Sequence, residues 1–404
     1  MGKTLLILID AFRFDYISKK HTPFLWSLSK SGHYIQKLEP SFGFCERTEI
    51  FVGKASKEFN YFTAIAYNPN MSPYKKYSFI LNILSKFTHL FPTIINRIFN
   101  RVIWEIMSRT PAGFPRAAIP VNLLKYFALT EDGLDSAIRH DKESLYQLSK
   151  KDGWGINDKC FTSLDAKQFA NDEVRINHIS KVLEGDDLLN MLFISECDKI
   201  GHQYGPDSPE MVYSVKKIDA KMKKLYEQSI LNYPDLNVIF CGDHGMTKVT
   251  QKINIFDAVS QELSEYDLGK DYVVFIDSTL FRVWSLNPKY KNDIDLKLKS
   301  LFKKENFSSV GYLTTPEKLG YKNDRLYGDW IWVARPGILI LNDYFSPAFR
   351  TIEGMHGYET HNQSYGMSIG VGPAFLKKQT KKDKLTAVYD MLLKSLEVKS
   401  NGDK

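Results

Sequence analysis

The sequence predicts an α/β fold, in which a mostly parallel central sheet is flanked by helices. Short apolar runs of β-branched and aromatic residues recur along the chain, which is typical of strands buried on both faces of a parallel sheet. They cover residues 5–9, 188–195 and 236–240, and each is followed within three residues by an aspartate. Helix signals separate the runs, and this alternation of strand and helix indicates the α/β class.

The amino-terminal residues begin the core at once. The apolar run 5–9 is too short for a signal peptide and has no small-residue cleavage site after it, so it is predicted as the first strand. Thr22 as the cap and Pro23 in the first turn start a helix that ends at Gly32. Residues 34–38 follow as a short strand, and residues 40–53 as a loop that enters a helix of about two turns.

Residues 61–179 interrupt this pattern. They are predicted as an inserted, mostly helical cap, with residues 1–60 and 180–404 as the α/β core. Residues 79–107 are rich in Ile, Leu and Phe, and Pro92 divides them into two amphipathic helices. One interpretation of the cap is that it only covers the sheet. The other is that it holds a bulky or lipid-linked substrate, or makes peripheral contact with a membrane through residues 79–107.

The carboxyl-terminal half returns to the strand and helix pattern. No stretch reaches the roughly 18 uncharged apolar residues of a transmembrane helix. The remaining elements are a helix over residues 208–232 with lysines on its solvent side, strands over 272–276, 279–284 and 337–341, and helices over 293–302 and 384–396.

Composition sets limits on the class of function. With 404 residues, 43% hydrophobic and 25% charged, the chain is an ordinary globular protein with one large core or two smaller ones. The net charge of +7 suits anionic substrates but is too small to indicate a nucleic-acid polymer as partner. The four cysteines show no paired spacing, so we expect no disulfides and a reducing, cytoplasmic location.

Acidic residues and histidines gather at the predicted strand ends. Open α/β sheets bind ligands at the carboxyl edge of their strands. Glycines on both sides of the Asp243-His244 pair permit a sharp turn there, and the four-residue spacing of Asp198 and His202 brings them to one side of a turn. Asp and His together suit a divalent cation such as zinc or manganese. The candidate set is Asp10, Asp198, His202, Asp243, His244 and His356.

The motifs around these residues resemble, in order, those of the type I phosphodiesterase/nucleotide pyrophosphatase family of the alkaline phosphatase superfamily. They are residues 9–16 (IDAFRFDY), 198–206 (DKIGHQYGP), 242–246 (GDHGM) and 356–358 (HGY). The resemblance implies an alkaline-phosphatase-like fold and two divalent ions, typically zinc. It places one ion at Asp10, Asp243 and His244 and the other at Asp198, His202 and His356.

The same resemblance implies a metal-dependent hydrolase of phosphate esters. A phosphodiester or nucleotide pyrophosphate is the leading substrate, attacked in line by a covalent nucleophile. Two alternatives stay open. One is a phosphotransferase or phosphomonoesterase acting on a glycan- or lipid-linked phosphate, and the other is a catalytically retired module that binds metal and phosphate.

The loop that carries the nucleophile in that family is where this chain departs from the pattern. The family's spacing from Gly53 falls on Gly43, which has no side chain, whereas the shorter spacing of cofactor-independent phosphoglycerate mutases falls on Cys45. A thiol beside zinc ionises readily and is a competent nucleophile. Thr48 is the nearest hydroxyl, and a mechanism without a covalent nucleophile is the third alternative. Arg47 either contacts a substrate phosphate bidentately or pairs with a neighbouring glutamate.

Overall fold

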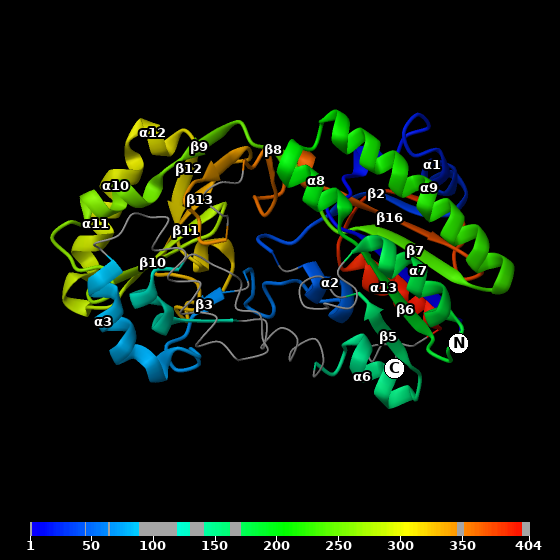
Figure 1. Ribbon diagram of the computed structural model, residues 1–404, viewed down its shortest axis with the longest axis horizontal. Helices are drawn as coiled ribbons and strands as arrows, with labels where there is room; N and C mark the ends of the chain where they lie inside the picture. Colours follow the sequence, from blue (N-terminus) through cyan, green and yellow to red (C-terminus); the bar gives the residue numbers. More distant parts are fainter. Residues whose placement is uncertain are drawn as a thin grey trace. The chain divides into compact units, whose positions relative to one another are not determined.

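The chain contains two compact units, shown in the ribbon drawing of the computed structural model (Figure 1). The structure describes residues 2–44, 46–63, 65–88, 119–129, 141–161, 171–345 and 351–397. Unit 1 comprises Met1–Phe62, Leu134–Lys248 and Ile352–Lys404, and unit 2 comprises Thr63–Gly133 and Val249–Thr351.

A seven-stranded sheet forms the centre of unit 1, with the strand order β17-β2-β16-β7-β1-β6-β5. Neighbouring strands pair in parallel, except that β16 is antiparallel to both β2 and β7. The predicted α/β fold with a mostly parallel sheet is therefore confirmed. The strands are β1 (Thr4–Ile9), β2 (His33–Glu39), β5 (Ile156–Cys160), β6 (Leu189–Ile194), β7 (Asn237–Gly242), β16 (Gly366–Val371) and β17 (Lys378–Lys384).

The three central strands β7, β1 and β6 are the apolar runs seen in the sequence. No side chain of β1 is more than 1% exposed, because the strand is hydrogen-bonded on both edges and covered on both faces. In register, Ile7 of β1 lies between Leu192 of β6 and Phe240 of β7. This pairing brings the carboxyl ends of all three strands to one edge of the sheet.

Helices cover both faces of this sheet (Figure 1). One group packs around the long helix α9 and buries Ile7 and Phe240 of the sheet in its core. The other group packs around the carboxyl-terminal helix α13, which contacts β1 and β7. The first group is α1 (Pro23–Ser31), α7 (Asp172–Leu183), α8 (Glu196–Tyr204) and α9 (Pro209–Asn232), and the second is α2 (Glu46–Val52), α6 (Leu145–Asp152) and α13 (Ala387–Leu396).

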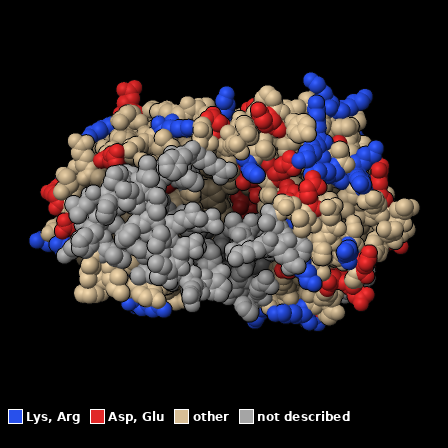
Figure 2. Space-filling model, viewed as in Figure 1, with Lys and Arg blue, Asp and Glu red and all other residues tan. Residues whose placement is uncertain are grey.

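Capping explains where two of these helices begin. The hydroxyl of Ser208 accepts a hydrogen bond from the Met211 amide at the start of α9. Thr22 occupies the predicted cap position of α1, but its hydroxyl donates to the Tyr16 carbonyl instead of capping the helix. The first amides of α1 donate to the carboxylate of Asp219 on α9. The lysines of α9 lie on its solvent side, and Figure 2 shows Lys and Arg side chains gathered over this helix.

Short elements complete the described part of unit 1. The antiparallel pair of β8 (Thr247–Lys248) and β15 (Gly354–Met355) joins the segment after β7 to the segment that carries His356. The 3-10 helices η1 (Phe14–Tyr16) and η7 (Asn362–Ser364) lie in the loops after β1 and before β16.

Unit 2 is built on a four-stranded antiparallel sheet with the order β10-β11-β13-β12. Phe127 of β4 packs edge-on against Phe275 and Trp284 and so joins the β3–β4 pair to this sheet. The described strands of unit 2 are β3 (Ile65–Tyr67), β4 (Phe127–Leu129), β9 (Gln251–Ile253), β10 (Tyr272–Ile276), β11 (Leu280–Ser285), β12 (Gly311–Thr314), β13 (Trp330–Ala334) and β14 (Ile338–Ile340). Its helices are η2 (Lys75–Tyr77), α3 (Ser78–Thr88), η3 (Val121–Tyr126), α10 (Ile255–Glu262), η5 (Pro288–Tyr290), α11 (Lys291–Lys303), α12 (Glu305–Ser308) and η6 (Glu317–Leu319).

The predicted cap of residues 61–179 stays a prediction as a single insertion. Its described residues are divided: β5 belongs to the seven-stranded sheet, while β3, α3 and β4 belong to unit 2. Of the two amphipathic helices predicted for residues 79–107, α3 covers the first part, and the remainder lies outside the described residues. No helix that the structure describes combines the length and apolar character needed to span a membrane.

Candidate functional site

Three aspartates meet at the carboxyl edge of the central strands. Asp10 directly follows β1, Asp243 directly follows β7, and Asp198 lies in the first turn of α8, which begins two residues after β6. Because β7, β1 and β6 are adjacent and parallel, their carboxyl ends share one edge, and the three carboxylates gather there. Histidines from the same and neighbouring loops divide the cluster into two sets.

The first set joins Asp10, Asp243 and His244, whose ligand atoms all lie within 4.8 Å of one another. His244 Nε2 lies 3.2 Å from Asp10 Oδ1 and 3.8 Å from Asp243 Oδ1. His244 Nδ1 lies 2.8 Å from the Gly245 carbonyl oxygen, which can only accept a hydrogen bond. In the neutral ring the proton therefore sits on Nδ1, and the Nε2 lone pair is left for a cation.

The backbone supports the first set from the turn after β1. Ala11 has φ of +57°, a left-handed conformation that few non-glycine residues adopt. The turn allows the Ala11 amide to donate to Asp243 Oδ1 at 3.2 Å, and the His244 amide donates to the same oxygen at 2.9 Å. Two backbone donors thus fix the Asp243 carboxylate.

The second set joins Asp198, His202 and His356, again with all ligand atoms within 4.8 Å of one another. Asp198 Oδ1 lies 3.1 Å from His202 Nε2 and 3.5 Å from His356 Nε2. His202 Nδ1 donates to the Gly354 carbonyl at 2.8 Å, so its Nε2 is also left for a cation. His356 Nδ1 is buried and has no hydrogen-bond partner among the described residues. The structure thus brings all six predicted ligands together.

The carboxylates of the first set hold their protons unusually tightly. Loss of water contact, with repulsion from Asp198 and Asp243, raises the pKa of Asp10 to about 7. Burial also raises the pKa of Asp243, although its backbone donors and His244 oppose the shift. Several carboxylates in so little water lack enough positive charge to ionise together, which is the electrostatic condition that a bound cation relieves.

The second set is electrostatically different. Burial alone would raise the pKa of Asp198, but His202 and then His356 and His244 hold it well below its usual value. Burial likewise opposes the charged form of His202, yet Asp198 raises the pKa of that imidazole. Asp198 is therefore an ionised carboxylate in the neutral pH range.

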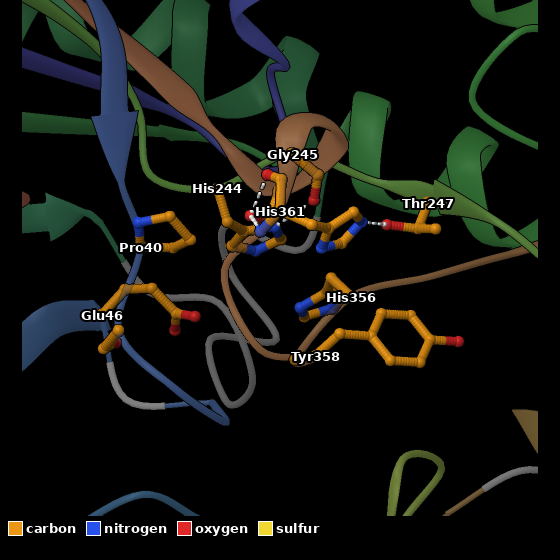
Figure 3. A pocket seen from close by; sticks show the side chains of 11 residues that line it. Pro40, Glu46, His244, Gly245, Thr247, His356, Tyr358 and His361 are labelled. Atoms are coloured by element: carbon orange, nitrogen blue, oxygen red, sulfur yellow. Dashed lines mark hydrogen bonds between the residues drawn. The ribbon is translucent and has the colours of Figure 1, made fainter. Parts of the chain in front are cut away.

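A pocket beside the two sets is lined by residues from the loops after β2, β7 and β15 (Figure 3). Glu46, the first residue of α2, belongs to this wall and was not predicted from the sequence. Its carboxylate lies within 4.8 Å of ligand nitrogens of both His244 and His356. The lining residues are Pro40, Ser41, Glu46, His244, Gly245, Thr247, His356, Gly357, Tyr358, His361 and Ser364.

His361 and Thr247 are further pocket residues that the sequence motifs do not indicate. His361 Nδ1 donates to the Glu359 carbonyl at 2.9 Å, so its Nε2 accepts the hydrogen bond from the Thr247 hydroxyl at 2.8 Å. Both ring nitrogens are engaged, which fixes the ring in the pocket wall (Figure 3).

Of the residues predicted for the nucleophile and for phosphate contact, the structure describes Thr48 and Arg47. Cys45 falls outside the described residues. Thr48 is fully buried within α2, and its hydroxyl has no hydrogen-bond partner in the described chain. The Arg47 guanidinium lies over the rings of Phe161 and Phe193 at 5.8 and 6.0 Å. Neither Thr48 nor Arg47 is among the described residues that line the pocket, and their catalytic roles stay predictions.

Ser41, upstream in the same loop, does line the pocket. Its hydroxyl is buried without a hydrogen-bond partner among the described residues, and its side chain belongs to a residue only 7% exposed. This makes Ser41 the hydroxyl of the predicted nucleophile loop that the structure places beside the histidines.

Comparison with known proteins gives one family. The family model of type I phosphodiesterase / nucleotide pyrophosphatase matches residues 4–44 and 116–359, which include all six residues of the two sets but neither Cys45 nor Glu46. The chain is 24% identical over 410 residues to human ectonucleotide pyrophosphatase/phosphodiesterase family member 5, covering 98% of this chain and 74% of that protein. It is 20% identical over 445 residues to ectonucleotide pyrophosphatase/phosphodiesterase 1 of Saccharomyces cerevisiae, covering 96% of this chain and 55% of that protein.

Solved structures show the same fold. Murine ectonucleotide pyrophosphatase/phosphodiesterase 5, an inactive variant in complex with AMP, superposes with a TM-score of 0.67 at 17% identity over 100% of this chain and 97% of that one. The human protein of the same name gives 0.67 at 18% identity over 100% and 96%. The chain belongs to the type I phosphodiesterase/nucleotide pyrophosphatase family, and the predicted membership is confirmed.

Proposed function

We propose that this chain hydrolyses phosphodiesters or nucleotide pyrophosphates with the help of two divalent cations. The observation that carries the proposal is the pair of ligand sets, each with carboxylate and imidazole donors, at one edge of the sheet. Family membership and the activities named for the relatives support the reaction class. The AMP bound to the murine relative supports a nucleotide as substrate.

The donors fit a borderline divalent cation. Asp10, Asp243 and His244 would hold one ion, and the second set would hold the other. Mixed oxygen and nitrogen donors suit zinc first and manganese second. The Oδ1 atom of Asp198 supports the fit, because it is buried without a hydrogen-bond donor among the described residues, and such a carboxylate oxygen is costly unless something binds it.

The chain itself contributes position and charge. Bound cations would lower the pKa of the attacking group and neutralise charge on the phosphate and the leaving group. The carbonyls of Gly245 and Gly354 hold His244 and His202 in the tautomer that presents Nε2. The amides of Ala11 and His244 hold the Asp243 carboxylate in one orientation. Such fixed donors need little reorganisation during the reaction.

The nucleophile, the cellular location and the alternative substrates are proposed from the sequence. Cys45 is the leading nucleophile by sequence, and Ser41 and Thr48 are the hydroxyl alternatives. The reducing, cytoplasmic location is a proposal that rests on the cysteine usage alone. Glycan- or lipid-linked phosphates remain alternative substrates, and membrane contact through residues 79–107 remains a prediction from the apolar character of that segment.

The proposal is tested with metal-free protein loaded with zinc or manganese. Turnover of bis(p-nitrophenyl) phosphate and of the p-nitrophenyl ester of thymidine 5′-monophosphate should exceed turnover of p-nitrophenyl phosphate, which reports monoesterase activity. A preference for the monoester would favour the phosphomonoesterase alternative. Protein that binds two metals and turns over none of these esters would contradict the proposal.

A further inference from the structure

Glu46 lies close to one histidine of each ligand set. Its carboxylate lies within 4.8 Å of a ring nitrogen of His244, which belongs to the first set, and of His356, which belongs to the second. Figure 3 shows the Glu46 carboxyl group pointing from the start of α2 toward these two imidazoles. In the described chain, Glu46 is the acidic residue grouped with one histidine of each set.

The packing of α2 fixes this direction. The residues that follow in the helix, Thr48, Ile50, Phe51 and Val52, are buried, and the helix packs against α13 and α6. The other glutamate of α2, Glu49, is buried on a different side, where its Oε1 accepts a hydrogen bond from the Ser56 amide. The two glutamates of one short helix therefore have different surroundings, and only Glu46 lines the pocket.

From this arrangement we propose that Glu46 is a bridging metal ligand, with one carboxylate oxygen for the cation of each set. The inference rests on the proposed two-cation site and deepens it. A carboxylate has two oxygens and commonly bridges the ions of dinuclear sites in proteins. The family model matches residues 4–44 and resumes at 116, so Glu46 lies in a segment where this chain departs from it.

A bridging Glu46 changes the charge of the metal site. Glu46 adds a fourth carboxylate to the three aspartates of the two sets. A bridging carboxylate holds both ions together and lowers their combined positive charge. We therefore expect this chain to bind its pair of ions more tightly, and more cooperatively, than it would with a neutral side chain at position 46.

The test compares Glu46→Gln with the matched control Glu49→Gln, which removes a buried carboxylate from the same helix. Metal-free proteins are titrated with Mn²⁺ by calorimetry, and the spin coupling of bound Mn²⁺ is read by electron paramagnetic resonance. Wild type and Glu49→Gln should bind two ions with a coupled spectrum. Glu46→Gln should bind at least one of the two ions at least about tenfold more weakly, because tenfold is the lower end of the loss caused by removing a supporting contact of a metal site. The same variant should lose most of the spin coupling between the two Mn²⁺ ions.

A second measurement needs no variant. In crystals of zinc-loaded wild type, the Glu46 oxygens should lie about 2.0–2.2 Å from the two ions.

Circular dichroism of each metal-free variant checks that the fold is kept, and Glu46→Asp, which retains the charge, should recover part of the affinity. Unchanged affinity and coupling in Glu46→Gln, or a Glu46 carboxylate turned away from the zinc ions, would overturn the bridging role and leave the proposed function standing. Wild type that binds fewer than two ions would instead overturn the proposed function.

Discussion

The imidazole rings of His244 and His356 are stacked, with 4.0 Å between their centroids and 13° between their planes. The two rings come from different ligand sets. Burial opposes a charge on His244, but Asp243 and Asp10 raise the pKa of that imidazole well above its usual value. Burial and then the charge of His244 lower the pKa of His356 well below its usual value. One stacked ring is therefore charged and the other neutral in the metal-free chain.

His356→Ala should reduce the bound metal from two ions to one, because it removes one of three donors from the second set. Metal affinity at the second set should fall at least about 100-fold. Loss of an outer-shell contact costs up to about that much, and His356 is a direct ligand in the proposed site. Metal content after dialysis, measured by mass spectrometry, checks this expectation. His361→Ala is the control, since both ring nitrogens of His361 bond to Thr247 and Glu359. Two ions retained in His356→Ala would remove this histidine from the site.

Metal binding should release protons and strengthen as pH rises from about 6 to 9. Burial raises the pKa of Asp10 to about 7, and that of Glu46 to about 8, in the metal-free chain. Below these values a cation must displace protons from the carboxyl groups. Calorimetry in two buffers with different ionisation enthalpies counts the protons released. A proton count of zero at pH 6.5 would contradict these raised pKa values.

The same carboxyl groups give the stability of the metal-free protein a pH dependence. The folded pKa of Asp10 is raised from 3.8, and that of Glu46 from 4.5, so the folded state binds their protons more tightly than the unfolded state. Their contribution is therefore complete below about pH 4 and is lost as pH rises toward 8. In urea unfolding, the metal-free protein should have a lower free energy of unfolding at about pH 8 than at about pH 5.5. With added zinc, the free energy of unfolding should be higher at about pH 8. An increase in metal-free stability over this range would contradict the assignment.

Gly357→Ala should disturb both the fold and the metal site. Gly357 has φ of +84°, and a Cβ there would lie 2.6 Å from the Phe44 ring, next to His356. Gly153→Ala is the matched control, since Gly153 has φ of +73° but no atom within 4 Å of an added Cβ. We expect about 1 kcal/mol of destabilisation for the control and at least about 2 kcal/mol for Gly357→Ala. Only Gly357→Ala should also weaken zinc binding. Equal effects on urea unfolding and zinc affinity would show that the Phe44 contact is unimportant.

The core strands and six site residues were predictable because their signals are local. The runs that form β1, β6 and β7 are apolar without interruption, and each aspartate stands within a few positions of its strand end. Three strands of the same sheet were not predicted, and one of them, β5, lies within residues 61–179, which were predicted as a mostly helical cap. β16 contains two glycines, and β17 reads KQTKKDK, a charged edge strand defined by its pairing with β2. The charge of β17 suits an exposed edge, which sequence alternation does not reveal.

Glu46 was missed for a different reason. The family motif directs attention to a hydroxyl or a thiol in its loop, and a glutamate at the start of a helix is ordinarily a favourable first-turn residue. Its proximity to His244 and His356 arises from tertiary packing, because α2 is separated from both by about 200 residues or more of sequence. The surroundings of Thr48 and Arg47 also depend on tertiary packing, and neither residue is among the described residues that line the pocket.

The nucleophile is assigned by three separate substitutions. Cys45→Ala should abolish turnover if the thiol forms the covalent intermediate, and Ser41→Ala should do so if the pocket hydroxyl takes that role. Thr48→Val should stabilise the protein by about 1 kcal/mol, because the Thr48 hydroxyl is buried without a partner in the described chain, and turnover unchanged in this variant would exclude Thr48 as the nucleophile. Rapid quench and intact mass spectrometry detect the covalent adduct. Full activity in both Cys45→Ala and Ser41→Ala would contradict a covalent mechanism through either residue.

The most direct test of the two-cation site is anomalous diffraction at the zinc edge from crystals of the zinc-loaded protein. Two peaks should lie at the carboxyl edge of β7, β1 and β6, one between Asp10, Asp243 and His244 and one between Asp198, His202 and His356. A single peak there, or zinc bound only elsewhere, would contradict the site on which the proposed function depends.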